Sequence, residues 1–177
     1  MRYQLMAAVV LLGPLAGCGG MDSGRAEADA VTAAVLQQAQ DRDQIEELLW
    51  RYARALDSSD ADGYAAVYTE DGEFSSGRNS IKGREALHKF VADLKQSRED
   101  RKARGENPGG TMHMTANHRI EFTGPDTATV HSYWITMFPA AGPENPVRVG
   151  AAGRGEDKLV RVDGKWLIQL RNVGLTD

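Results

Sequence analysis

Four long segments in the second half of the chain alternate apolar and polar residues with the period of a β-strand. They span residues 111–123, 127–138, 147–162 and 165–173, and short runs containing Gly, Pro or Asp separate them. The last separator, Asp163-Gly164, is a two-residue hairpin signal. Because short turns join antiparallel neighbours, this half of the chain predicts a four-stranded antiparallel meander.

The preceding part of the chain has helical periodicity instead. One apolar stripe, spaced i, i+3, i+4, i+7 and i+11, predicts a helix of about four turns and consists of Ile45, Leu48, Leu49, Tyr52 and Leu56. Ser58-Ser59-Asp60 offers capping oxygens to a second short helix, and residues 84–102 predict a third. Short edge strands are expected at 73–76 and 80–82. Three helices followed by a meander predict an α+β fold, with the helices packed on a strongly curved, mostly antiparallel sheet.

The first 40 residues have another composition. Arg2 precedes a short apolar run, and small residues lead to the only cysteine in Leu15-Ala16-Gly17-Cys18. This layout is typical of a secretory signal, and the run is too short to cross a bilayer as a helix. The four residues resemble the lipobox of bacterial lipoproteins, although an ordinary signal peptide is the alternative. We predict a lipoprotein signal over 1–17, lipidation of Cys18, a flexible tether over 18–40, and a domain over 41–177 attached to the cell envelope.

Charge and spacing exclude several classes of partner. The chain has 25 acidic and 21 basic residues, so no basic surface dominates and a nucleic-acid partner is not expected. His113 and His118 are separated by an odd number of residues, so on a regular strand they face opposite sides, and no metal site is predicted. The three glycines of 150–155 indicate a bend or bulge rather than a phosphate loop.

A polar row runs along the first long strand. Alternation places His113, Thr115, Asn117 and Arg119 on one face, and Met112, Met114, Ala116, Ile120 and Phe122 on the other. The polar row either faces solvent or lines a cavity. Two residues of the first helix favour a cavity. The hydroxyl of Tyr52, on the apolar stripe, needs a partner inside the fold. Asp57 lies at the helix end, where the dipole disfavours a carboxylate, so it either forms a local turn or orients an imidazole.

Residues 48–60, 68–72, 113–117 and 160–166 resemble the SnoaL-like branch of the nuclear transport factor 2-like superfamily. The resemblance implies a cone-shaped α+β barrel that encloses a pocket. Scytalone dehydratase and bile acid 7α-dehydratase are the most similar members in their working residues, which fall on Tyr52, Asp57 and His113. The resemblance implies that His113, held by Asp57, takes a proton from carbon beside a carbonyl, that Tyr52 assists, and that no metal or organic cofactor is needed. Pocket contacts are expected from Tyr68, Asn117, Trp134 and Thr136.

One position departs from that pattern. Thr136 stands where the bile acid enzyme has a further acid, and threonine cannot take a proton. We predict a cofactor-independent dehydratase or isomerase acting on an alicyclic or aromatic hydroxy-ketone. The alternative is a non-catalytic binding protein for a small apolar or polycyclic molecule at the envelope. The outer face of the sheet could also serve a homodimer, as it does in several relatives.

Overall fold

The computed structural model describes residues 19–77, 79–139 and 146–175, and the chain divides into two compact units, 1–40 and 41–177. In the first unit, helix α1 (Gly19–Ser58) already begins at Gly19, and the side chains of residues 24–40 are exposed. This differs from the expected flexible tether, because the Ala and Gln residues of this stretch are good helix formers. The predicted signal peptide and Cys18 lie outside the described residues. Within the described ranges, no helix combines the length and apolarity that crossing a membrane requires.

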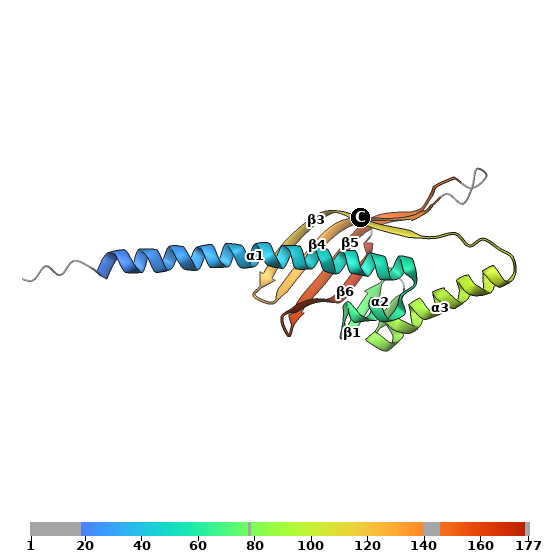
Figure 1. The fold of residues 1–177 in the computed structure, drawn as a ribbon, viewed down its shortest axis with the longest axis horizontal. Helices are drawn as coiled ribbons and strands as arrows, with labels where there is room; N and C mark the ends of the chain where they lie inside the picture. Colours follow the sequence, from blue (N-terminus) through green and yellow to red (C-terminus); the bar gives the residue numbers. More distant parts are fainter. Residues whose placement is uncertain (1–18, 78, 140–145, 176–177) are drawn as a thin grey trace, which may run out of the picture. The chain divides into compact units, whose positions relative to one another are not determined.

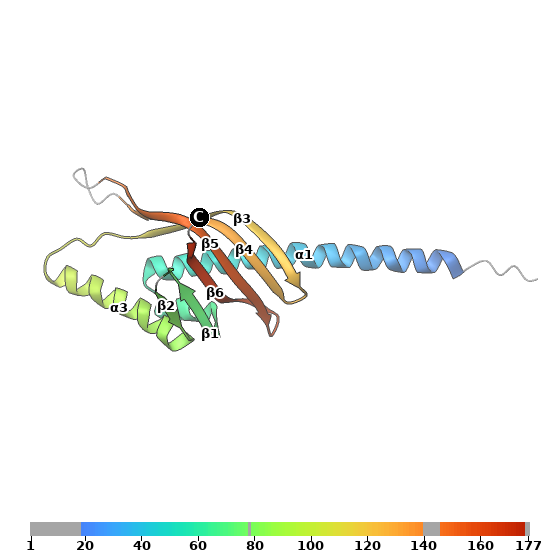
Figure 2. The ribbon, with the colours of Figure 1, turned by 180° about the vertical axis from the view of Figure 1, so that it is seen from behind.

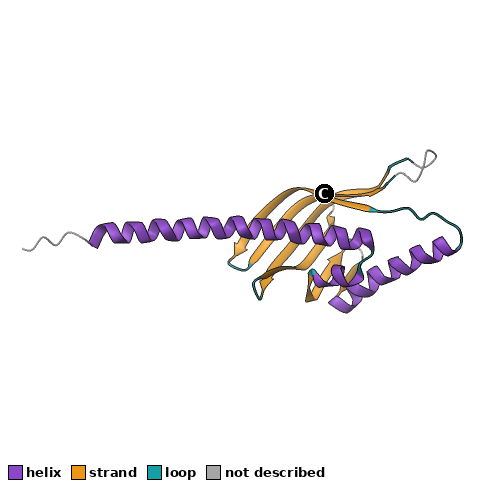
Figure 3. Cartoon of the chain, in the orientation of Figure 1, coloured by secondary structure: helices purple, strands orange, loops and turns teal. Residues whose placement is uncertain are grey.

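The second unit contains helices and one sheet (Figure 1; Figure 3). After α1, the elements are α2 (Ala61–Ala66), β1 (Tyr68–Ser75), β2 (Ser80–Lys82), α3 (Arg84–Ala103), β3 (Met112–Gly124), β4 (Thr127–Phe138), β5 (Arg148–Val162) and β6 (Lys165–Leu175). The predicted short helix, third helix, β2 and meander strands are therefore present within a few residues of their expected bounds. The side chain of Asp60 caps α2 by accepting a hydrogen bond from the backbone N–H of Gly63 at 3.0 Å.

The sheet has six strands in the order β2-β1-β6-β5-β4-β3. The meander from β3 to β6 is antiparallel, as predicted, but β1 pairs with β6 in parallel, so the sheet is mixed. β1 also begins at Tyr68, five residues before the edge strand expected at 73–76. The prediction of a barrel is wrong in one respect: β2 and β3 are the two edges, and the sheet does not close. The helices lie against one face of the sheet, and the other face is seen uncovered from behind (Figure 2).

The core forms where the predicted stripe of α1 meets this sheet. Ile45 and Leu48 are completely buried and belong to one apolar cluster with strand residues such as Val130 and Ile168. The second compact unit begins at Asp41, which is buried. Its carboxylate accepts hydrogen bonds from Trp166 Nε1 at 3.2 Å and Arg161 Nη2 at 2.8 Å. These bonds fasten the beginning of the domain to the last hairpin of the sheet.

A bulge in β3 changes the predicted assignment of faces. The register with β4 shifts between Ala116 and Arg119, and Asn117 has a φ of 54°. The extra residue turns the following side chains over, so that Ile120 is buried in the core cluster, on the side of the sheet that faces the helices. The predicted grouping of Ile120 and Phe122 with Met112 is therefore wrong, because a bulge breaks the strict alternation on which it rested.

Candidate functional site

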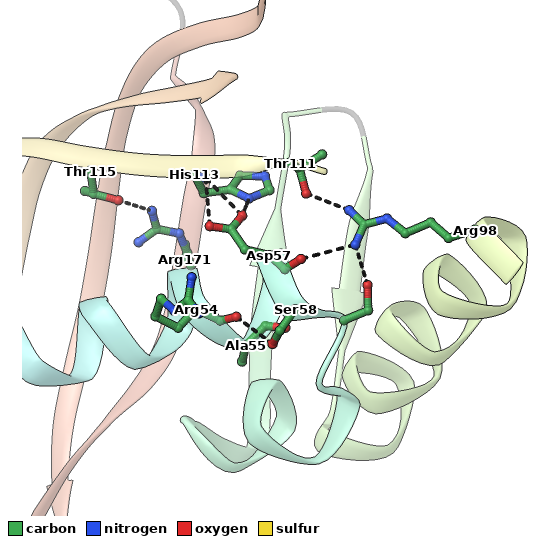
Figure 4. Close-up of polar contacts among 10 residues, drawn as sticks. Arg54, Ala55, Asp57, Ser58, Arg98, Thr111, His113, Thr115 and Arg171 are labelled. Carbon is green, nitrogen blue, oxygen red and sulfur yellow. Dashed lines mark hydrogen bonds and ion pairs between the residues drawn. The ribbon is translucent and has the colours of Figure 1, made fainter. Parts of the chain in front are cut away.

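His113 and Asp57 form a hydrogen-bonded pair between β3 and the last turn of α1 (Figure 4). Asp57 Oδ1 lies 2.6 Å from His113 Nδ1, and the same carboxylate accepts the backbone N–H of His113 at 3.0 and 3.2 Å. The side chain of His113 is 25% exposed and that of Asp57 is 12% exposed. Because an ionised carboxylate only accepts hydrogen bonds, this contact assigns the proton to Nδ1 and leaves Nε2 as a base.

A cavity of about 370 Å³ lies beside this imidazole. Its volume suits a small organic ligand. The wall is mainly apolar, and the polar or charged groups that border it are Tyr52, Arg98, Thr111, His113, Thr115, Thr136 and Arg171. A weakly hydrated wall strengthens the interactions of the polar groups that reach the ligand. A mostly apolar ligand bound in this cavity would meet one oriented base and several hydrogen-bond donors.

Arg171 brings a buried positive charge to the same cavity. Its guanidinium lies 4.2 Å from the centre of the Tyr52 ring, and its Nη1 donates to Asp157 Oδ2 at 2.5 Å. Arg171 and Asp157 are 3% and 1% exposed. Burial raises the pKa of Asp157 to about 6, against the opposing attraction of Arg171. Burial also raises the pKa of Tyr52, with Arg171 opposing, so Tyr52 stays protonated and can donate a hydrogen bond.

The sequence analysis missed Arg171 and Asp157. On a regular strand, Trp166 and Ile168 would face inward and residue 171 outward. The register between β5 and β6 shifts after Ile168, because Leu159 pairs with Ile168 while the adjacent Lys158 pairs with Leu170. This irregularity places Arg171 directly opposite Asp157 on the inner face. No signal in the strand pattern marks such a shift, and the only hint was a pair of complementary charges on neighbouring predicted strands.

The structure brings together most, but not all, of the predicted site residues. Tyr52, His113, Trp134 and Thr136 line the cavity, and Asp57 holds His113 from behind. Tyr68 is fully buried, and its hydroxyl lies 3.3 Å from that of Tyr64 in a cluster of tyrosine rings, away from the cavity lining. Asn117 occupies the bulge, is exposed, and borders a separate surface depression beside Tyr133. The expected ligand contacts of Tyr68 and Asn117 are therefore not supported by their positions.

Comparison with protein families identifies the domain. The model of a SnoaL-like domain matches residues 37–172. The chain belongs to the SnoaL-like family. Among solved structures, an NTF2-like protein with a cystatin-like fold from Novosphingobium aromaticivorans is 24% identical, with a TM-score of 0.65 over 80% of this chain and 85% of that one. This likeness shows that the open, curved sheet and its helices form the NTF2-like cone fold.

Two further solved structures are similar. A protein from the same bacterium, named as a putative scytalone dehydratase, is 26% identical, with a TM-score of 0.60 over 76% of this chain and 83% of that one. A protein from Catenulispora acidiphila in complex with S-DNPA is 25% identical, with a TM-score of 0.57 over 75% of this chain and 91% of that one. A comparison with curated proteins gives no match.

A second cavity of this SnoaL-like domain, of about 350 Å³, borders both Asp57 and His113. Both His113 and His118 line it. The bulge at Asn117 adds one residue to β3 between them, so the prediction that they face opposite sides, which assumed a regular strand, is wrong. Burial lowers the pKa of His118, while the charge of Glu46 opposes this effect. Over the described ranges, no group of three or more His, Cys, Asp or Glu side chains is arranged to hold a metal ion.

Glycines of β5 make room for the aromatic side chains of β4. A Cβ at Gly150 would lie 2.4 Å from the Phe138 ring, and one at Gly153 would lie 2.9 Å from the Trp134 ring. The predicted bend is accompanied by a register shift between Thr136 and Met137, but the closest demand on these glycines comes from the rings. The indole of Trp134, which lines the cavity, donates to the carbonyl of Arg154 at 3.1 Å.

We therefore expect Gly153→Ala to displace the Trp134 ring and to lower the free energy of unfolding by about 1–3 kcal/mol, as overpacking does. Denaturant unfolding gives the stability, and the NMR cross-peak of the Trp134 indole N–H reports the displacement. Gly110→Ala is the matched control, because a Cβ there meets no atom within 4 Å. An unmoved indole signal in Gly153→Ala would contradict the assigned contact.

Proposed function

We propose that this SnoaL-like domain is a cofactor-independent acid/base enzyme of the dehydratase or isomerase type that acts on an alicyclic or aromatic hydroxy-ketone. The observation that carries the proposal is the 2.6 Å contact between Asp57 and His113 Nδ1 at the wall of a mostly apolar cavity. It holds one tautomer of the imidazole and directs the chemistry to Nε2. The similarity to the protein named as a scytalone dehydratase supports the same class of reaction.

A dehydration needs only one proton-transferring group if that group acts twice. His113 Nε2 takes a proton from the carbon beside the carbonyl, and the electron pair of that C–H bond forms an enolate. The C–OH bond at the next carbon then breaks, the enolate electrons form the C=C bond, and the imidazolium returns its proton to the leaving hydroxide as water. Protons balance over the cycle, so the reaction does not require an acidic side chain at position 136. In an isomerisation, the same proton returns to another carbon.

Two donors are available for the negative charge that develops on the carbonyl oxygen. Arg171 and Tyr52 both line the cavity. Burial raises the pKa of Tyr52, and the pKa of Arg171 is raised because the attraction of Asp157 and the neighbouring tyrosines outweighs the opposing effect of burial, so both groups keep their protons. Donors already ordered in a water-poor site stabilise an enolate oxygen without reorganisation. Asp157 supports this role by holding Arg171 in place.

Turnover of a defined panel tests the proposal. The chain from residue 19 onward is incubated with cyclic β-hydroxy-ketones, and enone formation is followed by absorbance and by the loss of water in mass spectrometry. We expect an enone from at least one alicyclic or aromatic member. Recovery of every compound unchanged, including those that bind, would contradict the enzymatic proposal.

Binding without chemistry is the second candidate, and Thr136 is the residue that favours it. Thr136 lines the cavity, and the resemblance to bile acid 7α-dehydratase implies an acid at this position, which threonine does not supply. Native mass spectrometry of the protein purified from its own host distinguishes the two functions. A co-purifying small molecule that both the wild type and His113→Ala bind and leave unchanged would identify a carrier.

Export and lipid anchoring at Cys18 are a further part of the proposal, resting on the Leu15-Ala16-Gly17-Cys18 motif. We expect the membrane fraction of the producing bacterium to hold a chain that starts at Cys18 and carries acyl groups. Mass spectrometry of the N-terminal peptide measures this, and Cys18→Ser should release the chain from the membrane. The homodimer remains a prediction that sedimentation of the purified chain checks.

A further inference from the structure

Arg98 joins three segments that lie far apart in the sequence (Figure 4). From α3, its Nη1 donates to the backbone carbonyl of Asp57 at 3.2 Å and to Ser59 Oγ at 2.6 Å. Its Nη2 donates to Thr111 Oγ1 at 2.6 Å. One side chain thereby connects α3, the end of α1 and the residue directly before β3.

Two of the residues that accept these hydrogen bonds, Asp57 and Thr111, lie next to the proposed base His113. The Asp57 carbonyl belongs to the residue whose carboxylate holds His113, and Thr111 precedes His113 by two residues. Residues 105–110, which lead to β3, form a loop without helix or strand, and its Glu106 pairs with Arg101 and Arg104 of the preceding segment rather than with α1. In this loop, Gly105, Gly109 and Gly110 have no atom within 4 Å of a Cβ position. Arg98 therefore ties the start of β3 to the end of α1.

The end of α1 also needs a partner. The last carbonyls of a helix have no N–H from a following turn, and a positive charge is favourable there. Ser59, which follows the helix, has a φ of 57° and is 5% exposed, so its backbone is in the left-handed region that a non-glycine residue adopts at a cost. The guanidinium bonds to the Asp57 carbonyl and to the Ser59 hydroxyl together, so it stabilises this turn directly.

No carboxylate pairs with Arg98 in the described parts of the chain. Its three acceptors are a backbone carbonyl and two hydroxyls. A lysine would keep the charge, but it lacks the planar arrangement of donors that reaches three acceptors on different segments. The geometry therefore uses the shape of the guanidinium as well as its charge.

We propose that Arg98 is a positioning residue that sets the distance between Asp57 and His113 and thereby maintains the Nδ1–H form of the imidazole. The effect on turnover rests on the proposed function, whereas the effect on His113 does not. A misplacement of about 1 Å in a catalytic group can lower a rate by about 10². We expect Arg98→Met to lower kcat by about 10- to 100-fold with little change in KM.

Long-range ¹H–¹⁵N NMR of the imidazole nitrogens tests the proposal without a substrate. The wild type should show His113 as the Nδ1–H tautomer, with a slowly exchanging N–H proton bonded to Asp57. Arg98→Met should lose that proton signal and show mixed tautomers, Thr111→Val should weaken the signal, and Arg98→Lys should restore it only in part. Arg101→Met is the matched control, since Arg101 lies one turn further along α3 and pairs with Glu106.

Retention of the wild-type tautomer and N–H signal in folded Arg98→Met would overturn the proposal, and full restoration by Arg98→Lys would show that charge alone suffices. If Arg98→Met does not fold, Thr111→Val and Arg98→Lys decide by the same signal. Because Arg98 also borders the cavity, a rise in KM with an unchanged tautomer would identify a ligand contact instead. Absence of turnover in the wild type would refute the proposed enzyme while leaving this NMR result interpretable.

Discussion

Replacing His113 with Gln is expected to lower turnover by about 10²- to 10⁴-fold, the usual contribution of a positioned general base. Glutamine keeps polar atoms near the carboxylate of Asp57 but cannot take a proton from carbon. Asp57→Asn should have an effect of similar size, because an amide can donate to Nδ1 and thereby favour the tautomer that lacks the base at Nε2. Initial rates of enone formation give both values.

The matched control for this prediction is His131→Gln. His131 lies on β4, borders the surface depression beside Tyr133, and does not line the cavity. Its replacement should leave the rate within about twofold of wild type. Circular dichroism and thermal unfolding show whether each variant is folded. Unchanged turnover in a folded His113→Gln protein would remove His113 from the mechanism.

Removal of Arg171 is expected to have the largest effect on stability. Arg171→Met should lower the free energy of unfolding by about 3–5 kcal/mol, because Asp157 then remains in the core without its partner. Denaturant unfolding at pH 7 measures this loss. Arg119→Met is the control: Arg119 also pairs with a carboxylate, Glu121, but is 78% exposed. Its replacement should change stability by less than about 0.5 kcal/mol.

The stability lost in Arg171→Met should depend on pH in a defined direction. The folded-state pKa of Asp157, about 6, lies above its ordinary value of 3.8. A carboxyl with a raised pKa contributes stability at low pH, and this contribution is lost as pH rises through the folded-state pKa. In wild type, the stability that the Asp157 carboxyl contributes therefore decreases as pH rises from about 4 to 6. Without Arg171 the pKa rises further, so the deficit of Arg171→Met should be smaller at pH 5 than at pH 7.

The double variant Arg171→Met/Asp157→Leu separates the pair from its burial. Replacing both charges with apolar groups of similar size removes the desolvation cost as well as the attraction, so most of the lost stability should return. A double variant as unstable as Arg171→Met alone, or a deficit that does not change with pH, would contradict the account of Asp157 as an unpaired buried carboxylate.

Much of the domain follows from local patterns. The apolar stripe from Ile45 to Leu56 is sufficient to predict a core helix, since its spacing leaves one face that must be buried. The hairpin at Asp163-Gly164 and the alternation of the last four strands likewise predict the meander. The link between Asp57 and His113 came from resemblance to related enzymes rather than from spacing, and the 2.6 Å contact now connects these residues across 56 positions of the chain.

The inner surface of the sheet depends on information that alternation does not contain. A single extra residue at Asn117 moves His118 toward the pair, and an irregularity after Ile168 moves Arg171 into the core. Such shifts in register arise from the pairing of distant strands and from the curvature of the sheet. The same holds for the parallel pairing of β1 with β6, the open edges at β2 and β3, and the three bonds of Arg98. Periodicity along the chain thus establishes where the helices and strands lie and which face of α1 is buried, whereas long-range packing decides which strand side chains are buried and which of them meet at the cavity.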